Sequence, residues 1–485
     1  MGHTVLLYPH TGRNRSQDNI LPLSVLYVAS PVVHAGHTVT CIDQRMEPDW
    51  RAKLRRAVSE PRTLCVGISS MTGPQITHGI ELAQAVREMA PGLPIVWGGV
   101  HPSLLPEQTA ASPYVDIVAA GEGEACFPAL VDALDQGKDW RQLPGIFYKE
   151  NGGVRGNPFP PVPDIESIPP LPYELFDLEK YKISPLRTAG PSLPMVTSRG
   201  CRFRCAYCYI AQFQRRKWRG ISPERVIAEM KRLQTEYNAE GVFLLDDLFF
   251  QERARAHRIM ELLIENDVHI NIYNANCRID FLFRIPMEYL HMVRRAGIKQ
   301  LFIGTESGSP QVLKDMMKDI TVDQVLVANQ KLRDADIVPV YSFMAGIPGE
   351  TPSDVEMTLD LMIRLKEENP KAKLYKMCLF VPFPGTEYFD RVKQMGNRFP
   401  EKLEDWGTFD YDHVNLSYLT DDFRKYLAKV SELSGFVDVD GKMSGMLAPF
   451  VHLYSKIAVM RCKKRQFNWM PEMAAIRLAR AWQRV

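Results

Sequence analysis

Short apolar runs alternate with helical patterns along the first 137 residues of the chain. The runs lie at 4–8, 38–42, 64–69, 94–97 and 115–120. Alternating strands and helices favour a doubly wound parallel sheet, because two parallel strands need a long crossover that is usually a helix. The pattern therefore predicts a Rossmann-like α/β domain over 1–137.

Small and polar residues follow these runs, most clearly at 69–73, 98–99 and 121–124. In a doubly wound sheet, ligands bind at the carboxyl ends of the strands, and glycine there lets the backbone approach a ligand closely. No G-x-G-x-x-G follows the first run, which argues against a nicotinamide dinucleotide. We expect a different large cofactor at this edge.

A second alternation of apolar runs and helical patterns extends over 194–385. Strand candidates lie at 195–198, 241–245, 268–274, 300–304, 339–345 and 374–381. Helix-start signals stand between them at Ser222, Thr321 and Thr351. Six strand–helix units predict an incomplete relative of the eight-unit barrel, with its chemistry at the carboxyl ends of the strands.

Three cysteines, Cys201, Cys205 and Cys208, follow the first strand of this alternation with the spacing C-x-x-x-C-x-x-C. Such a loop aims three thiolates at one centre, where they can hold three corners of a cubane iron–sulfur cluster that normally takes four cysteine ligands. A structural zinc site would need a fourth Cys or His nearby, and the flanking residues offer neither. The spacing therefore predicts a 4Fe–4S cluster with one iron open to a substrate or cofactor.

Composition adds limits on the class of protein. The chain has 485 residues, 45% of them hydrophobic, and a net charge of +2, which predicts a soluble globular protein of two or three domains with no nucleic-acid partner. No signal peptide and no apolar run of about 18 residues is found. Nine cysteines without a disulfide pattern favour a reducing, cytoplasmic location.

Two further regions complete the expected organisation. Seven prolines between Pro158 and Pro172 predict an extended linker over 138–191, which precedes the barrel at 192–390. Residues 391–485 are expected to be mainly helical. Their last part, 450–485, holds eight Lys or Arg and one acidic residue, with aromatic residues interleaved. This pattern suits a helix on an anionic membrane surface or, as the favoured alternative, a helix packed on the barrel with a solvated basic face.

Taken in order, these motifs resemble the cobalamin-binding radical S-adenosylmethionine (SAM) enzymes, and in particular the class B methyltransferases, over about residues 1–390. The resemblance implies three cofactors: a 4Fe–4S cluster, SAM and cobalamin. It implies that Tyr207 lies beside the adenine of SAM and that Arg278 grips the carboxylate, since a guanidinium can bind it bidentately. The residues it assigns to SAM are Tyr207, Asp246, Asp247, Arg278, Thr305, Glu306, Ser307, Gly346, Gly349 and Pro384.

The same resemblance assigns the loops of the first domain to cobalamin. The residues are Ser69, Ser70, Thr72, Gly73, Gly98, Gly99, His101, Gly121, Glu122 and Gly123. The D-x-H-x-x-G signature is absent after the first run, so we expect cobalt without a histidine ligand from that motif.

The resemblance implies a radical SAM enzyme that methylates an unactivated carbon of a small-molecule or lipid-like intermediate, through a 5′-deoxyadenosyl radical and methylcobalamin. It also implies an electron donor such as flavodoxin or ferredoxin. Cyclisation or rearrangement without net methylation stays open, because some members of the class do this.

Two alternatives from other classes are also considered. A non-catalytic cobalamin sensor or carrier would cleave no SAM, whereas in an enzyme Cys205→Ala abolishes that cleavage. A cobalamin-free, methylthiotransferase-like protein would need a second cluster, and Cys41, Cys65 and Cys126 lie on separate predicted elements.

Overall fold

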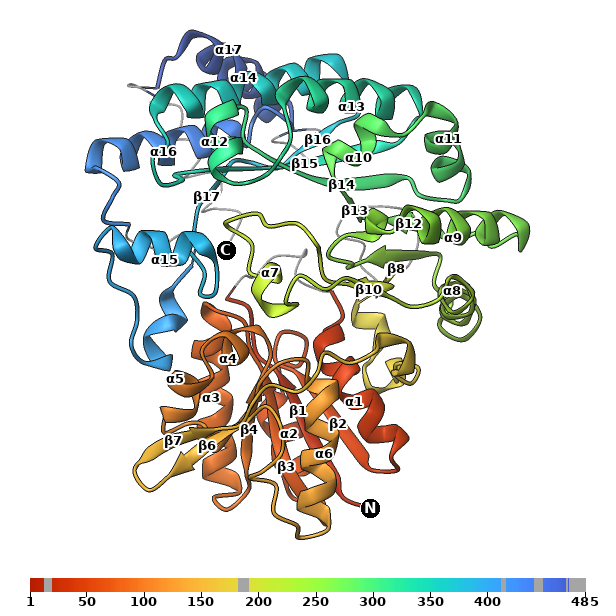
Figure 1. Cartoon of the computed structure of the whole chain (residues 1–485), viewed down its shortest axis with the longest axis vertical. Helices are drawn as coiled ribbons and strands as arrows, with labels where there is room; N and C mark the ends of the chain where they lie inside the picture. The colour runs from red at the N-terminus through yellow and green to blue at the C-terminus, as the bar shows by residue number, and fades with distance from the viewer. Residues whose placement is uncertain (13–19, 182–191, 411–415, 440–447, 468–469, 471–485) are drawn as a thin grey trace. The chain divides into compact units, whose positions relative to one another are not determined.

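The computed structural model describes residues 1–12, 20–181, 192–410, 416–439, 448–467 and 470. Internal contacts divide these residues into two units (Figure 1). Unit 1 comprises residues 1–276, 295–298 and 381–415, and unit 2 comprises residues 277–294, 299–380 and 416–485. Unit 1 therefore holds the whole first alternation together with the beginning of the second.

The first alternation forms one sheet in unit 1. Its parallel strands are β1 (His3–Tyr8), β2 (Thr38–Asp43), β3 (Thr63–Ser69), β4 (Ile95–Gly98) and β5 (Ile117–Ala119), and an antiparallel hairpin follows, β6 (Ile146–Glu150) and β7 (Gly153–Gly156). The strand order is β2-β1-β3-β4-β5-β6-β7. All five predicted runs are strands of this sheet, whereas the hairpin lies in the segment predicted to be a linker.

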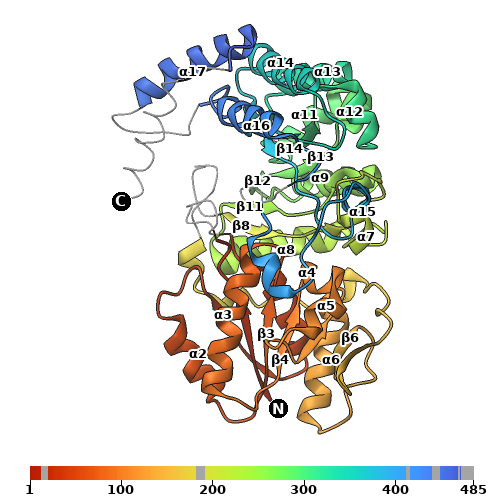
Figure 2. The same cartoon turned by 90° about the vertical axis from the view of Figure 1, so that its left-hand side faces the viewer.

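Helices cover both faces of this sheet. They are α1 (Leu23–His34), α2 (Trp50–Val58), α3 (Pro74–Met89), α4 (Val100–Leu104), α5 (Pro106–Ala111) and α6 (Gly123–Asp135). Figure 2 shows α2 and α3 on one side of β3 and β4, with α6 on the other. This arrangement is the doubly wound pattern that the sequence predicts.

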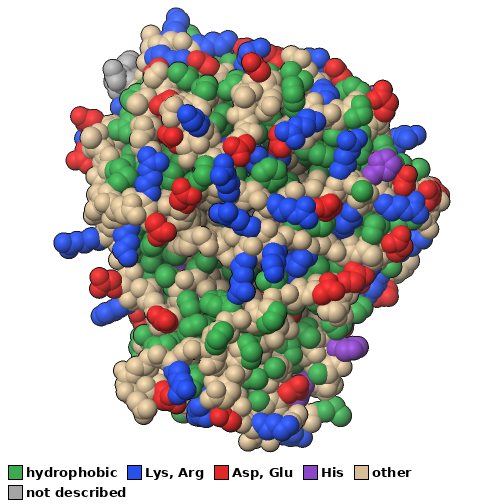
Figure 3. All heavy atoms as spheres, in the orientation of Figure 1, with side chains coloured by type: hydrophobic (Ala, Val, Ile, Leu, Met, Phe, Trp, Pro, Cys, Tyr) green, Lys and Arg blue, Asp and Glu red, His purple; other side chains and the backbone are tan. Residues whose placement is uncertain are grey.

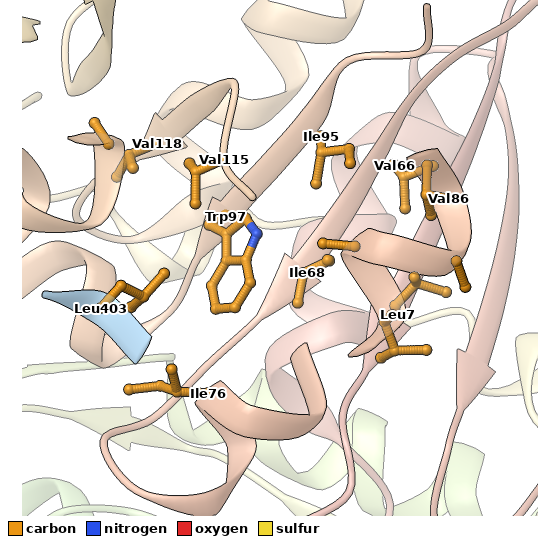
Figure 4. Close-up of a cluster of buried hydrophobic side chains, with 14 of the residues drawn as sticks. Leu7, Val66, Ile68, Ile76, Val86, Ile95, Trp97, Val115, Val118 and Leu403 are labelled. Carbon is orange, nitrogen blue, oxygen red and sulfur yellow. The ribbon is translucent and has the colours of Figure 1, made fainter. Parts of the chain in front are cut away.

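The core on the α3 face is completed by a segment from far along the chain. Trp97 is fully buried there, and Ile76 of α3 and Leu403 of η5 (Leu403–Thr408) lie beside it (Figure 4). Trp406, also of η5, is 1% exposed, and its indole Nε1 donates to Gln108 Oε1 at 2.5 Å. The described residues 381–410 therefore pack with the N-terminal sheet as part of unit 1.

The second alternation begins in unit 1 with three parallel strands in the order β12-β11-β8. These are β8 (Ser192–Met195), β11 (Gly241–Leu244) and β12 (Asn271–Tyr273), with α8 (Pro223–Tyr237) and α9 (Arg253–Glu265) between them. The helix-start signal at Ser222 is confirmed, because its side chain accepts from the Arg225 backbone N–H. Another helix, α15 (Glu387–Gln394), also belongs to this unit.

Unit 2 continues the alternation. Its strands are β14 (Gln300–Glu306), β15 (Val338–Ala345), β16 (Lys373–Leu374) and β17 (Cys378–Leu379), and β13 (Ala275–Cys277) leads into it from unit 1. Its helices are α10 (Ile279–Arg284), α11 (Met287–Arg295), α12 (Pro310–Asp315), α13 (Val322–Asp334), α14 (Pro352–Glu368), α16 (Asp421–Ser434) and α17 (Ala448–Lys464). Capping boxes start α13 at Thr321 and α14 at Thr351, as the sequence predicts. The predicted last strand, 374–381, is split into β16 and β17, both paired with β15.

The basic C-terminal region is described only in part. In α17 and just after it, Lys463 pairs with Glu367 at 2.7 Å and Arg465 with Asp360 at 2.5 Å, both acids of α14. The described part therefore packs on unit 2, and residues 471–485 lie outside the described residues. None of the helices in the described ranges combines the length and apolar character that a membrane span requires.

Candidate functional site

The three cysteines lie on a loop whose two ends are tied together. The antiparallel pair β9 (Ser198–Arg199) and β10 (Arg219–Gly220) closes it. Gly200 has φ +89°, and a Cβ there would lie 1.9 Å from the carbonyl oxygen of Lys217. Only glycine fits this junction, since any side chain would push the two ends of the loop apart.

Within the loop the thiols of Cys201 and Cys205 lie near enough to Cys208 to act on it by charge. The backbone N–H of Cys208 donates to the carbonyl of Cys205 at 3.1 Å, and all three cysteines are partly exposed. Burial raises the pKa of the Cys208 thiol to about 12, and Cys205, Cys201 and Asp247 add to the effect by charge repulsion. Three thiols that repel one another when ionised suit a positively charged iron centre, because metal binding favours the thiolate. The loop therefore fits the predicted cluster.

Two adjacent aspartates after β11 hold the stem of this loop. Asp246 is fully buried and accepts from the Thr197 N–H at 2.6 Å, the Thr197 hydroxyl at 2.6 Å and the Ser198 hydroxyl at 2.5 Å. Asp247 accepts from the Gly200 N–H at 2.6 Å, and burial raises its pKa to about 6. Both carboxylates thus position the loop, and their expected contact with the methionine part of SAM stays a prediction.

A cavity of about 340 Å³ in unit 1 extends from the sheet edge to this loop. Its walls come from the carboxyl ends of β1, β3, β4 and β5, from α1 and α6, and from the residues around the cysteines, including Tyr209, Phe213 and Asp247. The predicted cobalamin residues on its wall are Ser69, Gly98, Gly99, Gly121, Glu122 and Gly123. Ser70, Thr72, Gly73 and His101 do not line it.

The glycines keep this sheet edge open. Gly99 has φ +97°, and a Cβ on it would lie 2.7 Å from the Ser70 carbonyl oxygen. Gly121 has φ +96°, which also disfavours other residues. Backbone rather than side chains therefore forms this part of the wall, and a large flat ligand can approach it closely, as the cobalamin assignment requires.

His101 is buried beside the sheet edge and does not line the cavity. It is fully buried, its Nδ1 lies 2.9 Å from the Thr72 hydroxyl, and its ring meets Trp406 edge-on at 5.5 Å between centroids. Burial lowers its pKa to about 3, so the ring is neutral. His101 and Thr72 thus connect the loops at the sheet edge to the core, and cobalamin contact by either stays a prediction.

Sequence reasoning missed an ionic network in the cavity wall. Arg199 donates to Glu122 at 2.9 Å and to Glu124 at 2.6 Å, and its guanidinium lies 4.2 Å from the centroid of the Tyr27 ring. Arg219 also pairs with Glu122. Burial alone would raise the pKa of Glu122, but these two guanidinium groups hold it below its ordinary value. Arg199 stands two residues before Cys201, and this proximity is the signal that could have identified it.

The Glu122 carboxylate therefore forms ion pairs with residues of the protein itself, Arg199 and Arg219. It links the loop after β5 to both strands of the loop stem, and any contact with cobalamin is additional. Because Arg199, Glu122 and Glu124 are all largely buried, removing one partner would leave another charge unpaired away from water.

In unit 2, the residues at the end of β14 and just after it are held by buried polar contacts. Glu306 has φ +71° and pairs with Lys318 at 3.1 Å, with both side chains only 8% exposed. The Ser307 hydroxyl lies 3.1 Å from that of Thr358. Thr305 is fully buried, and its hydroxyl has no hydrogen-bond partner among the described residues. A non-glycine residue in this backbone region marks a strained turn of the kind found at binding sites.

The turn after β15 is held by Glu350. Gly346 (φ +85°) and Ile347 donate their N–H groups to Glu350 Oε2 at 2.5 and 3.2 Å, and Tyr418 donates to the Gly346 carbonyl at 2.6 Å. Gly349 also has a positive φ, +89°. Burial raises the pKa of Glu350 to about 7. The turn is thus preorganised with backbone at its surface.

The other SAM candidates are placed as follows. Arg278 donates to Asp280 Oδ1 at 2.8 Å and to the Lys318 carbonyl at 2.6 Å, so two nitrogen atoms of its guanidinium group already form hydrogen bonds within unit 2. Tyr207 is partly buried in the cysteine loop, and Pro384 precedes Gly385 (φ +76°) in unit 1. Their contact with SAM stays a prediction.

Comparisons with known proteins agree with this arrangement. Residues 195–362 match the Radical SAM superfamily, and residues 11–131 match the B12 binding domain. An uncharacterized methyltransferase of Pyrococcus horikoshii is 30% identical over 371 residues, which cover 76% of this chain and 78% of that protein. An anaerobic magnesium-protoporphyrin IX monomethyl ester cyclase of Rubrivivax gelatinosus is 28% identical over 416 residues, covering 84% of this chain and 71% of that one.

A solved structure shows the same fold. The radical SAM methyltransferase TsrM from Kitasatospora setae, with cobalamin and a 4Fe–4S cluster bound, has a TM-score of 0.71 and 17% identity, and the alignment covers 96% of this chain and 98% of TsrM. The predicted α/β fold class and the three predicted cofactors, a 4Fe–4S cluster, SAM and cobalamin, are confirmed at the level of the family. This chain belongs to the cobalamin-binding radical SAM enzymes.

Proposed function

We propose that this enzyme transfers a methyl group to an unactivated carbon of a small-molecule or lipid-like biosynthetic intermediate. The observation that carries the proposal is the cavity in unit 1, whose wall joins the open sheet edge to the cysteine loop. The methyltransferase name of the Pyrococcus relative supports it. When bound, the cluster with SAM supplies one-electron bond cleavage, and cobalamin supplies a transferable methyl group.

The chain's own residues give this chemistry its geometry. In the proposal, Cys201, Cys205 and Cys208 hold the cluster, and Asp246 and Asp247 fix the stem of their loop. The backbone at Gly99 and Gly121, which lines the cavity, would be available to hold the corrin. Arg199 joins the two sides through Glu122 and Glu124, so that the cavity wall has a fixed shape.

The cavity walls also bear on the substrate. Apart from the ionic network and Asp247, many of the side chains in the cavity wall are apolar, such as those of Leu23, Val28, Phe127 and Phe213. An apolar wall excludes water, which protects reactive intermediates from side reactions. It favours a substrate whose reacting part is hydrocarbon, in keeping with a lipid-like or aromatic small molecule.

The test is an anaerobic reconstitution with iron, sulfide and cobalamin, followed by counting both cofactors. After reduction and addition of SAM, mass spectrometry follows S-adenosylhomocysteine and 5′-deoxyadenosine. A methyltransferase produces both, and the Cys205→Ala variant produces no 5′-deoxyadenosine. The Trp50→Phe variant, on the opposite side of the sheet in α2, serves as a control with unchanged products.

A second function has support from one relative. The cyclase of Rubrivivax gelatinosus aligns over 84% of this chain. A cyclase would release 5′-deoxyadenosine without S-adenosylhomocysteine once its substrate is present. Failure to retain cobalamin in unit 1 would contradict both functions, because each requires the cavity to hold it.

A further inference from the structure

The sheet of unit 2 has two different faces. On β14 and β15, the side chains of Leu301, Ile303, Tyr341 and Phe343 are at most 1% exposed. The Tyr341 hydroxyl donates to Asn329 of α13 at 3.2 Å. This face therefore packs under the helices, and Figure 1 draws α13 and α14 along it.

Strand register identifies the residues of the opposite face. In a parallel sheet, paired residues of neighbouring strands point to the same side, and successive residues alternate. Phe302 pairs with Val340, which pairs with Lys373. Farther along β15, Met344 pairs with Cys378. We call this side the open face, because most of its residues are partly or largely exposed. It carries Phe302, Ser342, Met344, Lys373, Tyr375 and Cys378.

Much of the open face is apolar and aromatic. The rings of Phe302 and Tyr375 lie 5.8 Å apart between centroids and are tilted by 51°. Tyr375 is 45% exposed, so its ring offers surface on which another flat apolar group can stack. Met344 adds a thioether side chain, which adapts to differently shaped rings. These side chains suit a planar, apolar ligand.

Lys373 adds a positive charge to this face. Its side chain is partly buried, burial lowers its pKa, and it forms no ion pair with any residue that the structure describes. Asp438, whose charge acts on Lys373, pairs with Lys366 at 3.0 Å. Glu306 pairs with Lys318 at 3.1 Å. A partly buried ammonium group without a counter-ion is costly, and an anionic ligand would supply one.

Charges on the helical side of unit 2 are balanced differently. Figure 3 shows Lys and Arg interspersed with Asp and Glu over the part of the displayed face where Figure 1 draws α13 and α14. Arg364 of α14 pairs with Glu368 at 2.6 Å, and Lys371 pairs with Asp336 at 2.5 Å. Lys373 thus differs from these surface cations in lacking an acidic neighbour of its own.

The open face leads to the turns that the resemblance assigns to SAM. The Ser342 hydroxyl donates to Glu306 Oε2 at 3.4 Å, and β15 ends at Ala345, directly before Gly346. In barrel enzymes the reacting groups gather at the carboxyl ends of the strands. A small ligand on the open face would therefore reach the expected cofactor, which favours a substrate over a protein partner.

We propose that the open face binds the substrate of this enzyme, a small molecule with a flat apolar ring system and an anionic oxygen group that pairs with Lys373. The ring system lies against Phe302 and Tyr375, and the anionic group is a carboxylate or a phosphate. The inference rests on the proposed function, because it assigns the substrate of that reaction.

The first test is binding of model compounds to the reconstituted full chain, measured as a Kd by equilibrium dialysis. The probe is 2-naphthoate, a flat aromatic carboxylate. Neutral 2-naphthamide should bind at least about tenfold more weakly, because it forms no ion pair. Decanoate, which is charged but has no ring, should bind at least about threefold more weakly. A lower Kd for 2-naphthyl phosphate than for 2-naphthoate would identify the anionic group as a phosphate, and a higher one as a carboxylate. Equal Kd values for 2-naphthoate and 2-naphthamide, or no saturable binding of either anion, would overturn the proposal.

The second test removes the charge. Lys373→Met keeps a side chain of similar length and should bind 2-naphthoate at least about tenfold more weakly, with binding of 2-naphthamide unchanged. Lys373→Arg should restore binding. The matched control is Lys376→Met, because Lys376 is exposed and lies beside Gly435, just after α16. It should bind 2-naphthoate like the original protein, and equal loss in the two methionine variants would overturn the proposal.

The aromatic contact is tested at Tyr375. Tyr375→Leu should bind both naphthalene probes at least about threefold more weakly and bind decanoate unchanged, because only the ring loses its stacking partner. Phe283→Leu, at a position 41% exposed in α10, should leave all three affinities unchanged. Unchanged binding in Tyr375→Leu would overturn the assignment of the ring system to this face.

Alkylation of Cys378 reports where the probe binds. Its thiol is partly exposed and belongs to the open face. Bound 2-naphthoate should slow labelling of Cys378 by iodoacetamide in proportion to the fraction of protein occupied, as followed by peptide mass spectrometry. Lys373→Met at the same probe concentration should show less protection. Unchanged labelling of the occupied original protein would place the probe elsewhere and overturn the proposal.

The two proposals fail in different ways. If S-adenosylhomocysteine does not form, the proposed methyl transfer is wrong, whereas binding that depends on Lys373 is unaffected by that result. If the open face is not the site, Lys373→Met binds 2-naphthoate like the original protein, whereas the nucleoside products of the original protein are as proposed.

Discussion

At the scale of single residues, a few buried carboxylates set the geometry of the loops around the site. Asp246 accepts three hydrogen bonds from Thr197 and Ser198, which follow β8. Glu350 accepts hydrogen bonds from two backbone N–H groups after β15. Hydrogen bonds to a buried carboxylate are worth more than those between neutral groups, and losing one partner leaves a costly unpaired group. These acids are therefore structural supports of neighbouring binding loops.

Glu350 makes stability depend on pH. Burial raises its pKa from the ordinary value of 4.5 to about 7. Between these values the folded state binds the proton more tightly than the unfolded chain does, so stability falls as pH rises through that window and the contribution is lost above pH 7. The contribution of this pKa difference to the free energy of unfolding is about 3 kcal/mol at most. Glu350→Gln should remove this dependence, because a glutamine can still accept from the Gly346 and Ile347 N–H groups.

The measurement compares thermal midpoints from pH 5 to pH 8. The original protein should lose stability relative to Glu350→Gln as pH rises. Glu288→Gln, at an exposed position in α11, should instead give a profile parallel to that of the original protein. A parallel profile for Glu350→Gln would show that Glu350 does not titrate in this window.

At the scale of elements, the cysteine loop depends on its stem. The strands β9 and β10 hold two residues each, so the loop has little pairing of its own. Its position is fixed by side chains from elsewhere, namely Asp246, Asp247 and the pair Glu122 and Glu124. A cluster site must be held within a few tenths of an ångström, and such supporting contacts provide that rigidity.

Gly200→Ala should open this stem. The new Cβ would lie 1.9 Å from the Lys217 carbonyl oxygen, and the residue has φ +89°. We expect the variant to lose most of its iron after reconstitution, measured by iron assay and by the visible absorption of the cluster.

Gly137→Ala is the matched control. Gly137 also has a positive φ, +62°, but nothing lies within 4 Å of a Cβ built there. It should keep its iron and lose only about 1–2 kcal/mol of stability from backbone strain. Equal iron in the two variants would show that the close approach at Gly200 does not determine the cluster site.

At the scale of the whole chain, the N-terminal sheet is completed by residues that follow the second alternation. Trp406 and Phe409 pack with Trp97 in one core, and Gly79 of α3 leaves room for the Trp97 ring, which a Cβ would meet at 2.7 Å. Residues 381–410 therefore belong to the N-terminal core in space, although they lie in the barrel and C-terminal regions of the expected organisation. The predicted domain boundaries remain predictions.

Trp406→Ala should destabilise the N-terminal sheet by about 3–5 kcal/mol, because it leaves a large cavity at a fully buried position. Hydrogen exchange followed by mass spectrometry should show faster exchange of the amides of β3 and β4. Phe283→Ala, at a position 41% exposed in α10 of unit 2, should leave those amides unchanged. Unchanged exchange in Trp406→Ala would mean that the segment is not part of this core.

The sequence by itself determined the strands of the first alternation and the chemistry of the cysteine motif. Strand and helix periods and the spacing of Cys201, Cys205 and Cys208 are local features, and all five runs of the first alternation became parallel strands. The glycine clusters at 98–99 and 121–123 likewise marked the cavity wall, since strand ends of a parallel sheet meet at one edge.

Only the tertiary structure decided which polar residues face a ligand and which support other residues. Arg199 meets Glu122 across 77 residues, and Trp406 meets Gln108 across 298. No local pattern encodes such partners, because they are selected by packing and by the need to pair every buried charge. For this reason the structure alone shows that His101 and Asp246, which the resemblance assigns to cofactors, also hold core and loop, and that Arg199 pairs with Glu122 and Glu124. The cofactor contacts of His101 and Asp246 stay predictions.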